Sequence, residues 1–322
     1  MTVPAQDLLG HAEAWREWRG AMGSGRMHHA WILAGKQGLG KAMFAHAAAR
    51  ELVAEAGIAQ PAHHPDIIEL APLPANDEEQ KKKDEGKPYQ TKRNISVDQV
   101  RAVQHRLTTR PTLGSRRVIV IDPADDMEKG AVNALLKSLE EPPAGTFFLL
   151  VAHRPGRLLP TIRSRCRTLR FPTLADAEVA RVIGAMAPQA DGATRAAAVA
   201  AAEGSPGAAL GFVEQELGPV HTLMERLVGE GDPLFVLRGA LAGEIGARPD
   251  RPRLLATLDL ARAVLAARLT VAPPLQRLRI IDAHAALATL TGQVPTFNYD
   301  AGLLAMEIGG LLASAALPRE AA

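Results

Sequence analysis

Short apolar runs, bounded by glycine or polar residues, recur through the first half of the chain. The clearest are AWILA at Ala30–Ala34, VIVI at Val118–Ile121 and FFLLV at Phe147–Val151. Runs this short and apolar throughout predict strands that are buried on both faces. The runs Ile67–Leu70 and Leu169–Phe171 extend the set, so the pattern predicts a buried sheet.

Helical spacing of apolar residues fills the intervals between these runs. The expected helices are Leu8–Met22 (with Leu8, Leu9, Trp15 and Trp18 inward), Lys41–Ala56, Val97–Thr109 after an N-cap at Ser96, and Gly130–Glu140. Strands that alternate with helices in this way favour a parallel sheet with crossover helices.

The pattern changes after Pro172, where only helical periodicity remains. The clearest stretches are Ala175–Pro188, Gly192–Glu203, Pro252–Leu269, Leu275–Leu290 and Gly302–Ala316. We therefore predict an α/β domain over residues 1–172, a small helical domain over 173–214 and a helical domain over 215–322.

The segment 76–93 differs from the rest of the chain. It reads NDEEQKKKDEGKPYQTKR, with five acidic and six basic side chains and almost no apolar positions. A segment of this composition has too little apolar surface to build a core. We therefore predict a solvated, mobile loop here.

Composition narrows the class of protein. The 37 basic and 35 acidic side chains leave a net charge of +2, which excludes a polybasic nucleic-acid binder but not a local basic face. The single cysteine excludes a disulfide framework and a multi-cysteine zinc site, and it fits a reducing cytosol. No apolar stretch approaches the ~18 residues of a membrane span, and the N-terminus lacks the pattern of a signal peptide. We expect a cytoplasmic protein with no membrane contact.

The turn after the first strand carries the strongest chemical signal. Residues 35–42 read GKQGLGKA, which fits the phosphate-binding pattern G-x-x-x-x-G-K without its final serine or threonine. Gly35, Gly38 and Gly40 would let backbone N–H groups face phosphate oxygens, and Lys41 would meet the outer phosphates. Ala42 stands where a hydroxyl normally binds Mg²⁺, and alanine has no ligand atom.

A second element of such a site follows the strand VIVI. Asp122 is placed to act on a metal, but the next residue is Pro123, where a hydrolytic enzyme would carry a glutamate that orients water. Proline supplies neither an acid nor a backbone donor. Asp125 and Asp126 come later, and we expect them at a helix N-terminus.

Four segments together resemble bacterial clamp-loader subunits of the AAA+ class. They are Met27–Ala42, Val132–Ala152 (VNALLKSLEEPPAGTFFLLVA), Leu158–Cys166 (LLPTIRSRC) and Gly204–Leu210 (GSPGAAL). The resemblance covers about Leu8 to Leu210. It implies an AAA+ type parallel-sheet P-loop domain, a small helical lid domain and a C-terminal helical collar domain.

The resemblance also implies a function. Members of this family form hetero-pentamers with motor subunits and a clamp-opening subunit, and they use ATP to place a sliding clamp on primer–template DNA. In the motif Ser164-Arg165-Cys166, Arg165 would be the arginine finger that reaches the ATP of a neighbouring subunit. A guanidinium suits that role because it is always charged and offers a rigid fork of donors. Cys166 is expected to be buried and inert.

Departures from the family pattern point to a subunit that does not hydrolyse ATP. Ala42 and Pro123 replace metal-site and water-orienting residues, Ala152-His153 stands where the first sensor carries threonines, and Gly207-Ala208 where the second sensor carries arginine. We expect no required cofactor, with weak ATP or ADP binding left open. The family's four-cysteine zinc module is absent.

His63 and His64 lie in the region of that module, and we expect them in a loop and not in a metal site.

Two other functions remain open from the sequence. One is an ATP-hydrolysing subunit of the motor type, against which Ala42 and Pro123 argue. The other is direct binding of primer–template DNA through phosphate contacts of arginines near the helix after Ser96. Those arginines are Arg101, Arg106, Arg110, Arg116 and Arg117. No segment resembles a polymerase active site.

Overall fold

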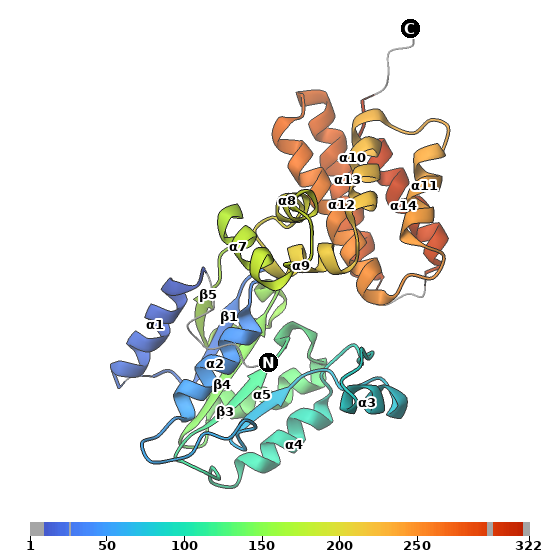
Figure 1. The fold of residues 1–322 in the computed structure, drawn as a ribbon. Coiled ribbons are helices and arrows are strands. Elements are labelled where there is room, and N and C mark those ends of the chain that lie inside the picture. The colour runs from blue at the N-terminus through green and yellow to red at the C-terminus, as the bar shows by residue number, and fades with distance from the viewer. Residues whose placement is uncertain (1–9, 26, 295–298, 318–322) are drawn as a thin grey trace. The chain divides into compact units, whose positions relative to one another are not determined.

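Five parallel strands in the order β2-β3-β4-β1-β5 form the centre of the N-terminal part of the chain (Figure 1). They are β1 (Ala30–Ala34), β2 (Ile67–Leu70), β3 (Arg117–Ile121), β4 (Thr146–Ala152) and β5 (Arg167–Arg170). The computed structural model describes residues 10–25, 27–294 and 299–317. The predicted parallel sheet is confirmed, including the weak run that becomes β5.

The chain divides into two compact units, Met1–Thr173 and Leu174–Ala322. This division falls beside the boundary predicted at residue 172. The further boundary predicted between residues 214 and 215 lies inside the second unit and stays a prediction.

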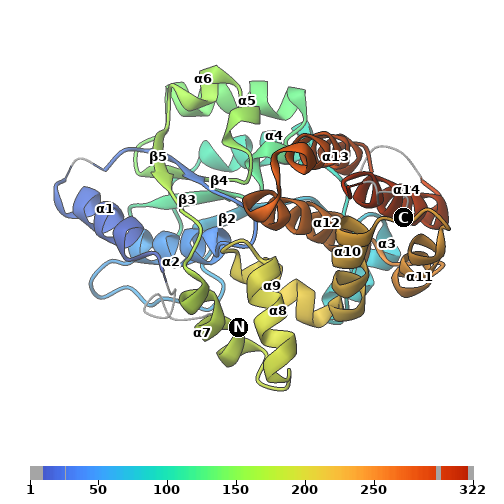
Figure 2. The ribbon, with the colours of Figure 1, turned by 90° about the horizontal axis from the view of Figure 1, so that it is seen from above.

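Helices cover both faces of the sheet. They are α1 (Ala12–Gly23), α2 (Lys41–Val53), α4 (Val97–Leu107), α5 (Lys129–Glu140) and α6 (Pro160–Arg163), with short 3-10 helices η2 (Ala124–Asp126) and η3 (Pro155–Arg157). Figure 2 shows α4, α5 and α6 on one face and α1 and α2 on the other. Each face has its own apolar core, because strands buried on both sides need cover on both sides.

Aromatic packing fixes α1 on its face. Trp18 is fully buried, with its ring centroid 5.6 Å from that of Trp31 and 6.2 Å from that of Phe44. The prediction that Trp15 and Trp18 point inward is therefore confirmed. Leu8 and Leu9 lie outside the described residues. The N-cap predicted at Ser96 is also confirmed, since Ser96 and Gln99 form a reciprocal capping box.

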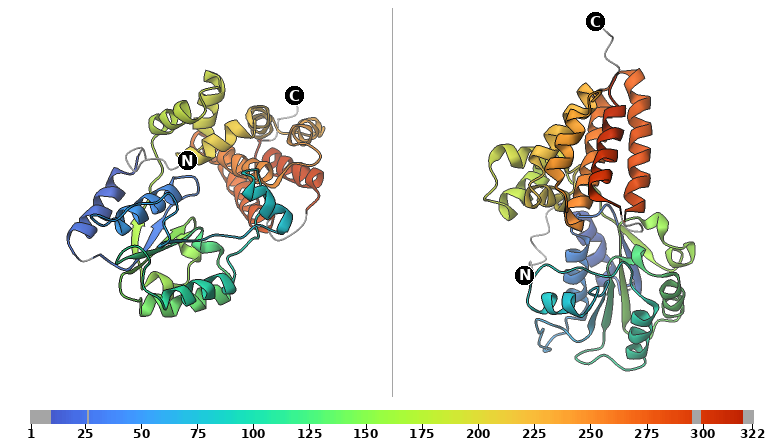
Figure 3. Two further views of the ribbon diagram at one scale, coloured as in Figure 1. Left: turned by 60° about the horizontal axis from the view of Figure 1, so that its bottom comes forward. Right: turned by 90° about the vertical axis from the view of Figure 1, so that its right-hand side faces the viewer.

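The charged segment 76–93 contains a helix, so the prediction of a loop was wrong for its first half. Its first half is helix α3 (Asp77–Asp84), capped by the Asn76 side chain, and Figure 3 shows it apart from the sheet of its unit. The carboxylate of Glu79 is buried, where it accepts hydrogen bonds from Gln90 N at 2.6 Å and from Lys82 Nζ at 2.6 Å. Helix capping and ionic hydrogen bonds order this segment without an apolar core.

We expect Glu79→Gln to make the backbone of the segment 76–93 less rigid. The ammonium of Lys82 and the N–H of Gln90 together hold the pKa of Glu79 below its ordinary value, so the carboxylate is ionised at neutral pH. An amide oxygen accepts the same hydrogen bonds more weakly. Amide hydrogen exchange at Gln90 should accelerate about tenfold, whereas the exposed neighbour substitution Glu78→Gln should leave it unchanged. Equal exchange in both variants would contradict this account.

The second unit is helical throughout the residues that the structure describes. Its helices are α7 (Asp176–Met186), α8 (Gly192–Ala201), α9 (Pro206–Glu214), α10 (Gly218–Glu230), α11 (Val236–Ile245), α12 (Arg251–Val271), α13 (Pro274–Gln293) and α14 (Ala301–Ser314). One apolar core runs through all eight of these helices. The predicted helical character after Pro172 is confirmed. Among the described helices, none is both long and apolar enough to cross a membrane.

Candidate functional site

The predicted phosphate loop joins β1 to α2, the position that its sequence pattern requires. Gly38 and Gly40 both have φ of +79°, a left-handed conformation that glycine adopts without steric cost. A Cβ atom on Gly35 would lie 2.4 Å from the carbonyl oxygen of Phe171. All three glycines are therefore required by the geometry of the loop.

A hydrogen bond from outside the loop also holds it. His11 Nε2 lies 2.6 Å from the carbonyl oxygen of Leu39, and the His11 ring packs edge-on against Phe171 with centroids 4.9 Å apart. The sequence analysis missed His11, because 28 residues separate it from Leu39 and no local pattern connects the two.

Lys41 is turned into its own loop. Its Nζ donates hydrogen bonds to the carbonyl oxygens of Gly35 at 2.7 Å and Lys36 at 2.6 Å, and the residue is 2% exposed. Burial lowers the pKa of Lys41 to about 8, against the opposing effects of Asp122 and Asp125. The lysine is mainly charged at neutral pH, and loop carbonyls take up its hydrogen bonds.

Two carboxylates lie near this ammonium group, with different roles. Asp122 directly follows β3, as predicted, and burial followed by the charge of Glu69 raises its pKa. Asp125 lies in η2, where its carboxylate accepts hydrogen bonds from the backbone N–H groups of His153 and Arg154 at 2.9 Å. Asp125 and Asp126 thus lie in the first turn of a short helix, as expected, and the carboxylate of Asp125 also fixes the end of β4.

His153 stands at the first-sensor position, directly after β4. Burial, followed by the positive charge of Lys41, lowers the pKa of His153 to about 4. Its ring is therefore neutral at pH 7. Its Nδ1 is buried and has no hydrogen-bond partner among the described residues. The sequence analysis recorded only the missing threonines here and did not identify this histidine.

The site thus brings a lysine and two aspartates together beside the glycine loop. Ala42 offers no oxygen to a metal, and Pro123 follows Asp122 where a water-orienting acid would stand. Among the described residues, no group of three or more histidine, cysteine or acidic side chains gathers where it could hold a metal ion. The glycine loop therefore surrounds a lysine whose hydrogen bonds go to the carbonyl oxygens of Gly35 and Lys36.

His64 serves the loop that contains it. It is buried, and its Nδ1 accepts a hydrogen bond from Asp66 N at 3.2 Å. This contact closes the turn before β2, consistent with the loop expected for His63 and His64.

Arg165 lies between α6 and β5 at the surface of the first unit. Its Nη2 lies 2.5 Å from Glu140 Oε1, and its Nη1 donates to the carbonyl oxygen of Thr161 at 3.0 Å and to Ser164 Oγ at 3.4 Å. The next residue, Cys166, is half-buried against the core, and burial raises the pKa of its thiol to about 12. Such a thiol is almost entirely protonated at neutral pH and therefore unreactive.

Arg165 and the phosphate loop lie at opposite ends of the parallel strands. β1 and β5 are parallel neighbours, with Trp31 beside Arg167 and Ala34 beside Arg170. The phosphate loop follows the last residue of β1, whereas Arg165 comes before the first residue of β5. A five-residue strand spans roughly 15 Å. Arg165 therefore cannot serve the phosphate loop of its own chain.

Most of the arginines considered for DNA binding are committed to the fold. Arg117 is 3% exposed and donates to the backbone carbonyls of Arg106, Thr109 and Arg110. Arg106 donates to Pro65 O and Arg116 donates to Leu52 O. The expectation that Arg117 contributes to a surface patch was wrong, because this guanidinium closes the C-terminal end of α4.

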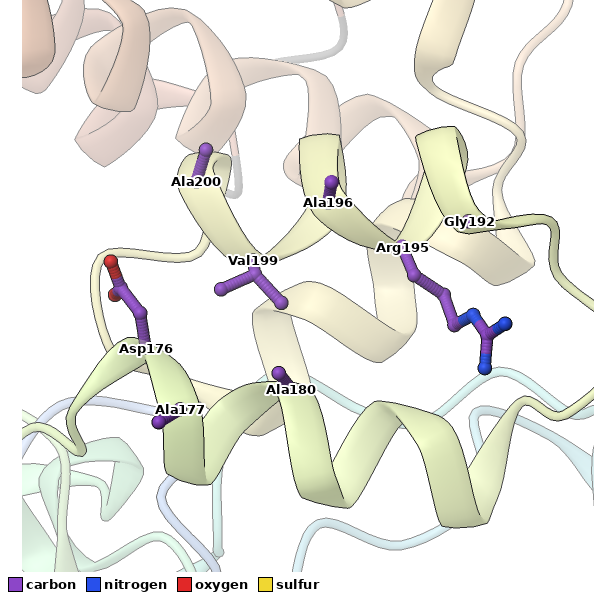
Figure 4. A pocket seen from close by; sticks show the side chains of 8 residues that line it. All are labelled: Asp176, Ala177, Ala180, Gly192, Arg195, Ala196, Val199 and Ala200. Atoms are coloured by element: carbon purple, nitrogen blue, oxygen red, sulfur yellow. The ribbon is translucent and has the colours of Figure 1, made fainter.

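A cavity of about 630 Å³ lies in the second unit between α7 and α8 (Figure 4). It is lined by Asp176, Ala177, Ala180, Gly192, Arg195, Ala196, Val199 and Ala200. Small apolar side chains form most of its wall, and the figure shows Asp176 and Arg195 well apart from one another. The cavity gathers no set of reactive groups.

Comparisons with known proteins show which family the chain resembles. The family model described as DNA polymerase III, delta subunit, matches residues 10–175, just over half of the chain. The delta' subunit of Pseudomonas aeruginosa is 35% identical over 162 residues, which cover 46% of this chain and 44% of that protein. The delta' subunit of Escherichia coli K12 is 34% identical over 157 residues, 45% of this chain and 42% of that protein.

More distant likenesses extend further along the chain. The gamma/tau subunit of Mycobacterium tuberculosis H37Rv is 29% identical over 228 residues, 65% of this chain and 37% of that protein. A crystal structure of a gamma subunit-related protein from Thermotoga maritima is 17% identical and covers 92% of this chain and 98% of its own, with a TM-score of 0.48. The sequence matches thus span less than half the length of the curated relatives. On the strength of the family match, the chain belongs to the DNA polymerase III delta subunit family.

Proposed function

We propose that this chain is a delta'-type clamp-loader subunit that does not hydrolyse ATP and supplies Arg165 to a neighbouring subunit. It would assemble with gamma/tau-type motor subunits and a delta subunit into a hetero-pentamer in the cytoplasm. The pentamer would use ATP to load the sliding clamp on primer–template DNA. The chain would contact the clamp and the DNA as part of that complex. It would take part in DNA synthesis only as a subunit of the DNA polymerase III holoenzyme.

The observation that carries this proposal is the placement of Arg165. The guanidinium lies at the surface, before the first residue of β5, at the end of the strands opposite to the phosphate loop of its own chain. An arginine so placed is suited to act on a nucleotide held by another subunit. There it would stabilise the negative charge of the transferring phosphoryl group.

The state of the phosphate loop supports the non-hydrolysing part of the proposal. Lys41 is held by the carbonyl oxygens of Gly35 and Lys36, and Ala42 and Pro123 leave the metal and the attacking water without their usual partners. The motor-type alternative requires both groups, and this chain has Ala42 and Pro123 in their places. We expect ATP or ADP to bind weakly, at Gly35, Gly38, Gly40 and Lys41, without turnover.

An exposed apolar stripe on α13 supports the scaffolding part. Leu275, Leu278 and Ile281 are 78%, 67% and 51% exposed, and they recur at helical spacing. Contiguous apolar surface of this kind is typical of protein–protein contacts. The near-neutral net charge fits a protein whose main partners are other subunits.

Reconstitution tests the proposal directly. The purified chain should show no ATP turnover above background with Mg²⁺ and saturating ATP. Mixed with gamma/tau-type and delta subunits, it should co-elute with them in size-exclusion chromatography and raise DNA-stimulated hydrolysis. The matched control is the double substitution Ala42→Thr and Pro123→Glu, which tests whether the missing groups limit the lone chain. Turnover by the unaltered chain that Lys41→Ala abolishes would overturn the non-hydrolysing assignment.

A further inference from the structure

One ion pair at the surface of the first unit involves the arginine on which the proposed function depends. Arg165 Nη2 lies 2.5 Å from Glu140 Oε1, and the two side chains are 34% and 48% exposed. Glu140 is the last residue of α5, and Arg165 follows α6. The pair thus joins the end of one helix to the loop that carries the arginine.

The C-terminal end of α5, which carries Glu140, is fixed by contacts of the preceding residue. Leu139, the preceding residue, is buried in the core beside β4, and its carbonyl oxygen accepts a hydrogen bond from His29 Nε2 at 2.9 Å. α5 ends at Glu140, and Pro142 follows two residues later. The backbone at Glu140 is therefore held in place, and the ion pair limits the positions that the Arg165 guanidinium adopts.

The hydrogen bonds of Arg165 leave part of its donor set unused. A guanidinium carries five N–H donors. Thr161 O and Ser164 Oγ accept from Nη1, and Glu140 pairs with Nη2. Within the described part of the chain no acceptor faces Nε, so Nε and the second N–H of Nη2 are uncommitted. A phosphate can therefore take a pair of donors while Glu140 keeps its own contact.

We propose that Glu140 is a positioning residue for Arg165. It holds the guanidinium extended from α6 in the isolated chain, so that docking against a neighbour's nucleotide does not first require an arginine side chain to be ordered. Ordering a long, flexible side chain costs conformational entropy. Glu140 removes that cost before the transition state is reached, and it does not contact the nucleotide. This inference rests on the proposed function of Arg165.

The test is steady-state hydrolysis by the reconstituted loader in which only the motor site next to this chain is left active. Glu140→Ala should lower kcat about twofold to fivefold, the range expected for loss of one exposed ion pair, with the KM for ATP unchanged. Glu140→Gln should give a kcat between those of the unaltered chain and Glu140→Ala, because the amide oxygen keeps a partial negative charge beside the guanidinium but loses the full charge of the ion pair. Glu141→Gln is the matched control, since Glu141 is exposed and makes no ion pair in the described structure, and it should behave as the unaltered chain.

A second set of variants separates positioning from stability. In a chain that already carries Arg165→Ala, adding Glu140→Ala should leave the rate unchanged, whereas a purely structural role would cost the same factor in both backgrounds. If Arg165→Ala alone leaves hydrolysis intact, the proposed function fails. If Arg165→Ala lowers kcat and Glu140→Ala does not, or if Glu140→Ala raises kcat because the carboxylate competes with phosphate, only the role of Glu140 is overturned.

Discussion

Replacing Arg165 with alanine is expected to slow ATP hydrolysis at the neighbouring motor site by about 10³-fold or more, the usual contribution of an arginine finger. The guanidinium lies at the surface, at the end of the parallel strands opposite to the phosphate loop of its own chain. Its loss removes positive charge from a position where negative charge develops on the transferring phosphoryl group. The KM for ATP should change little, because the nucleotide is held by the other subunit.

The measurement is DNA-stimulated phosphate release by the reconstituted loader, with the other motor sites inactivated. Arg163→Ala is the matched control, because Arg163 is an exposed arginine two residues away, at the end of α6, and its side chain forms no hydrogen bond or ion pair in the described structure. Arg165→Lys should recover only part of the rate, since a lysine keeps the charge and loses the fork of donors. Both variants should assemble normally in size-exclusion chromatography, and an unchanged rate for Arg165→Ala would refute the trans-acting role.

Replacing Asp66 with alanine is expected to lower the free energy of unfolding of the first unit by about 3–5 kcal/mol. Asp66 is fully buried; it accepts hydrogen bonds from Thr112 N at 2.7 Å and Leu113 N at 2.8 Å, and lies 3.6 Å from the guanidinium of Arg117. Alanine would leave the buried charge of Arg117 and two backbone donors without a partner. The free energy of unfolding of a domain is only about 5–15 kcal/mol, so the expected loss is a large fraction of the total stability.

Acid should also lower the stability of the unaltered protein through the Asp66 carboxylate. Burial, the largest single influence, raises the pKa of Asp66, but the N–H groups of Leu113 and Thr112 together with Arg117 outweigh it and hold the pKa below the ordinary value of 3.8. A carboxylate with a depressed folded-state pKa contributes stability above its unfolded-state pKa. That contribution falls as the pH drops below about 4 towards the folded-state pKa.

Urea unfolding of the full chain at pH 7 and at pH 3–4 measures both effects. Asp98→Ala is the matched control, because Asp98 pairs with Arg101 on the surface and its side chain is 86% exposed; such pairs contribute about 1 kcal/mol or less. Asp66→Asn should be destabilised at pH 7 and should lose part of the pH dependence. Equal stability of the Asp66→Ala and Asp98→Ala variants would show that the buried pair is not required.

The phosphate loop could be predicted from sequence because its residues are adjacent in the chain. Glycine spacing, the lysine and the flanking strand and helix are local features, and the structure places Gly35, Gly38, Gly40 and Lys41 together as expected. What the spacing did not reveal is that Lys41 binds its own loop. That contact depends on where two carbonyl oxygens point, and their orientation follows from the left-handed glycines.

The charged segment shows a limit of reasoning from composition. Residues 76–93 have almost no apolar side chains, so burial gives them no reason to fold. Their order comes from a capping asparagine and from Glu79, whose carboxylate meets Gln90 N eleven residues away. Composition gives the number of charged side chains. Whether the segment folds depends on which hydrogen-bond partners each of them finds.

The sequence by itself determined the alternation of strands and helices, the all-helical second half, the phosphate loop and the loss of its hydrolytic groups, because each is written in adjacent residues or in a periodic pattern. Only the tertiary structure decided that Arg117 is buried, that Asp125 holds the end of β4, and that Glu140 pairs with Arg165. These contacts join residues that are up to 51 positions apart in the chain, as with Asp66 and Arg117. The parallel sheet brings such residues together at its edges, and no local spacing carries that information.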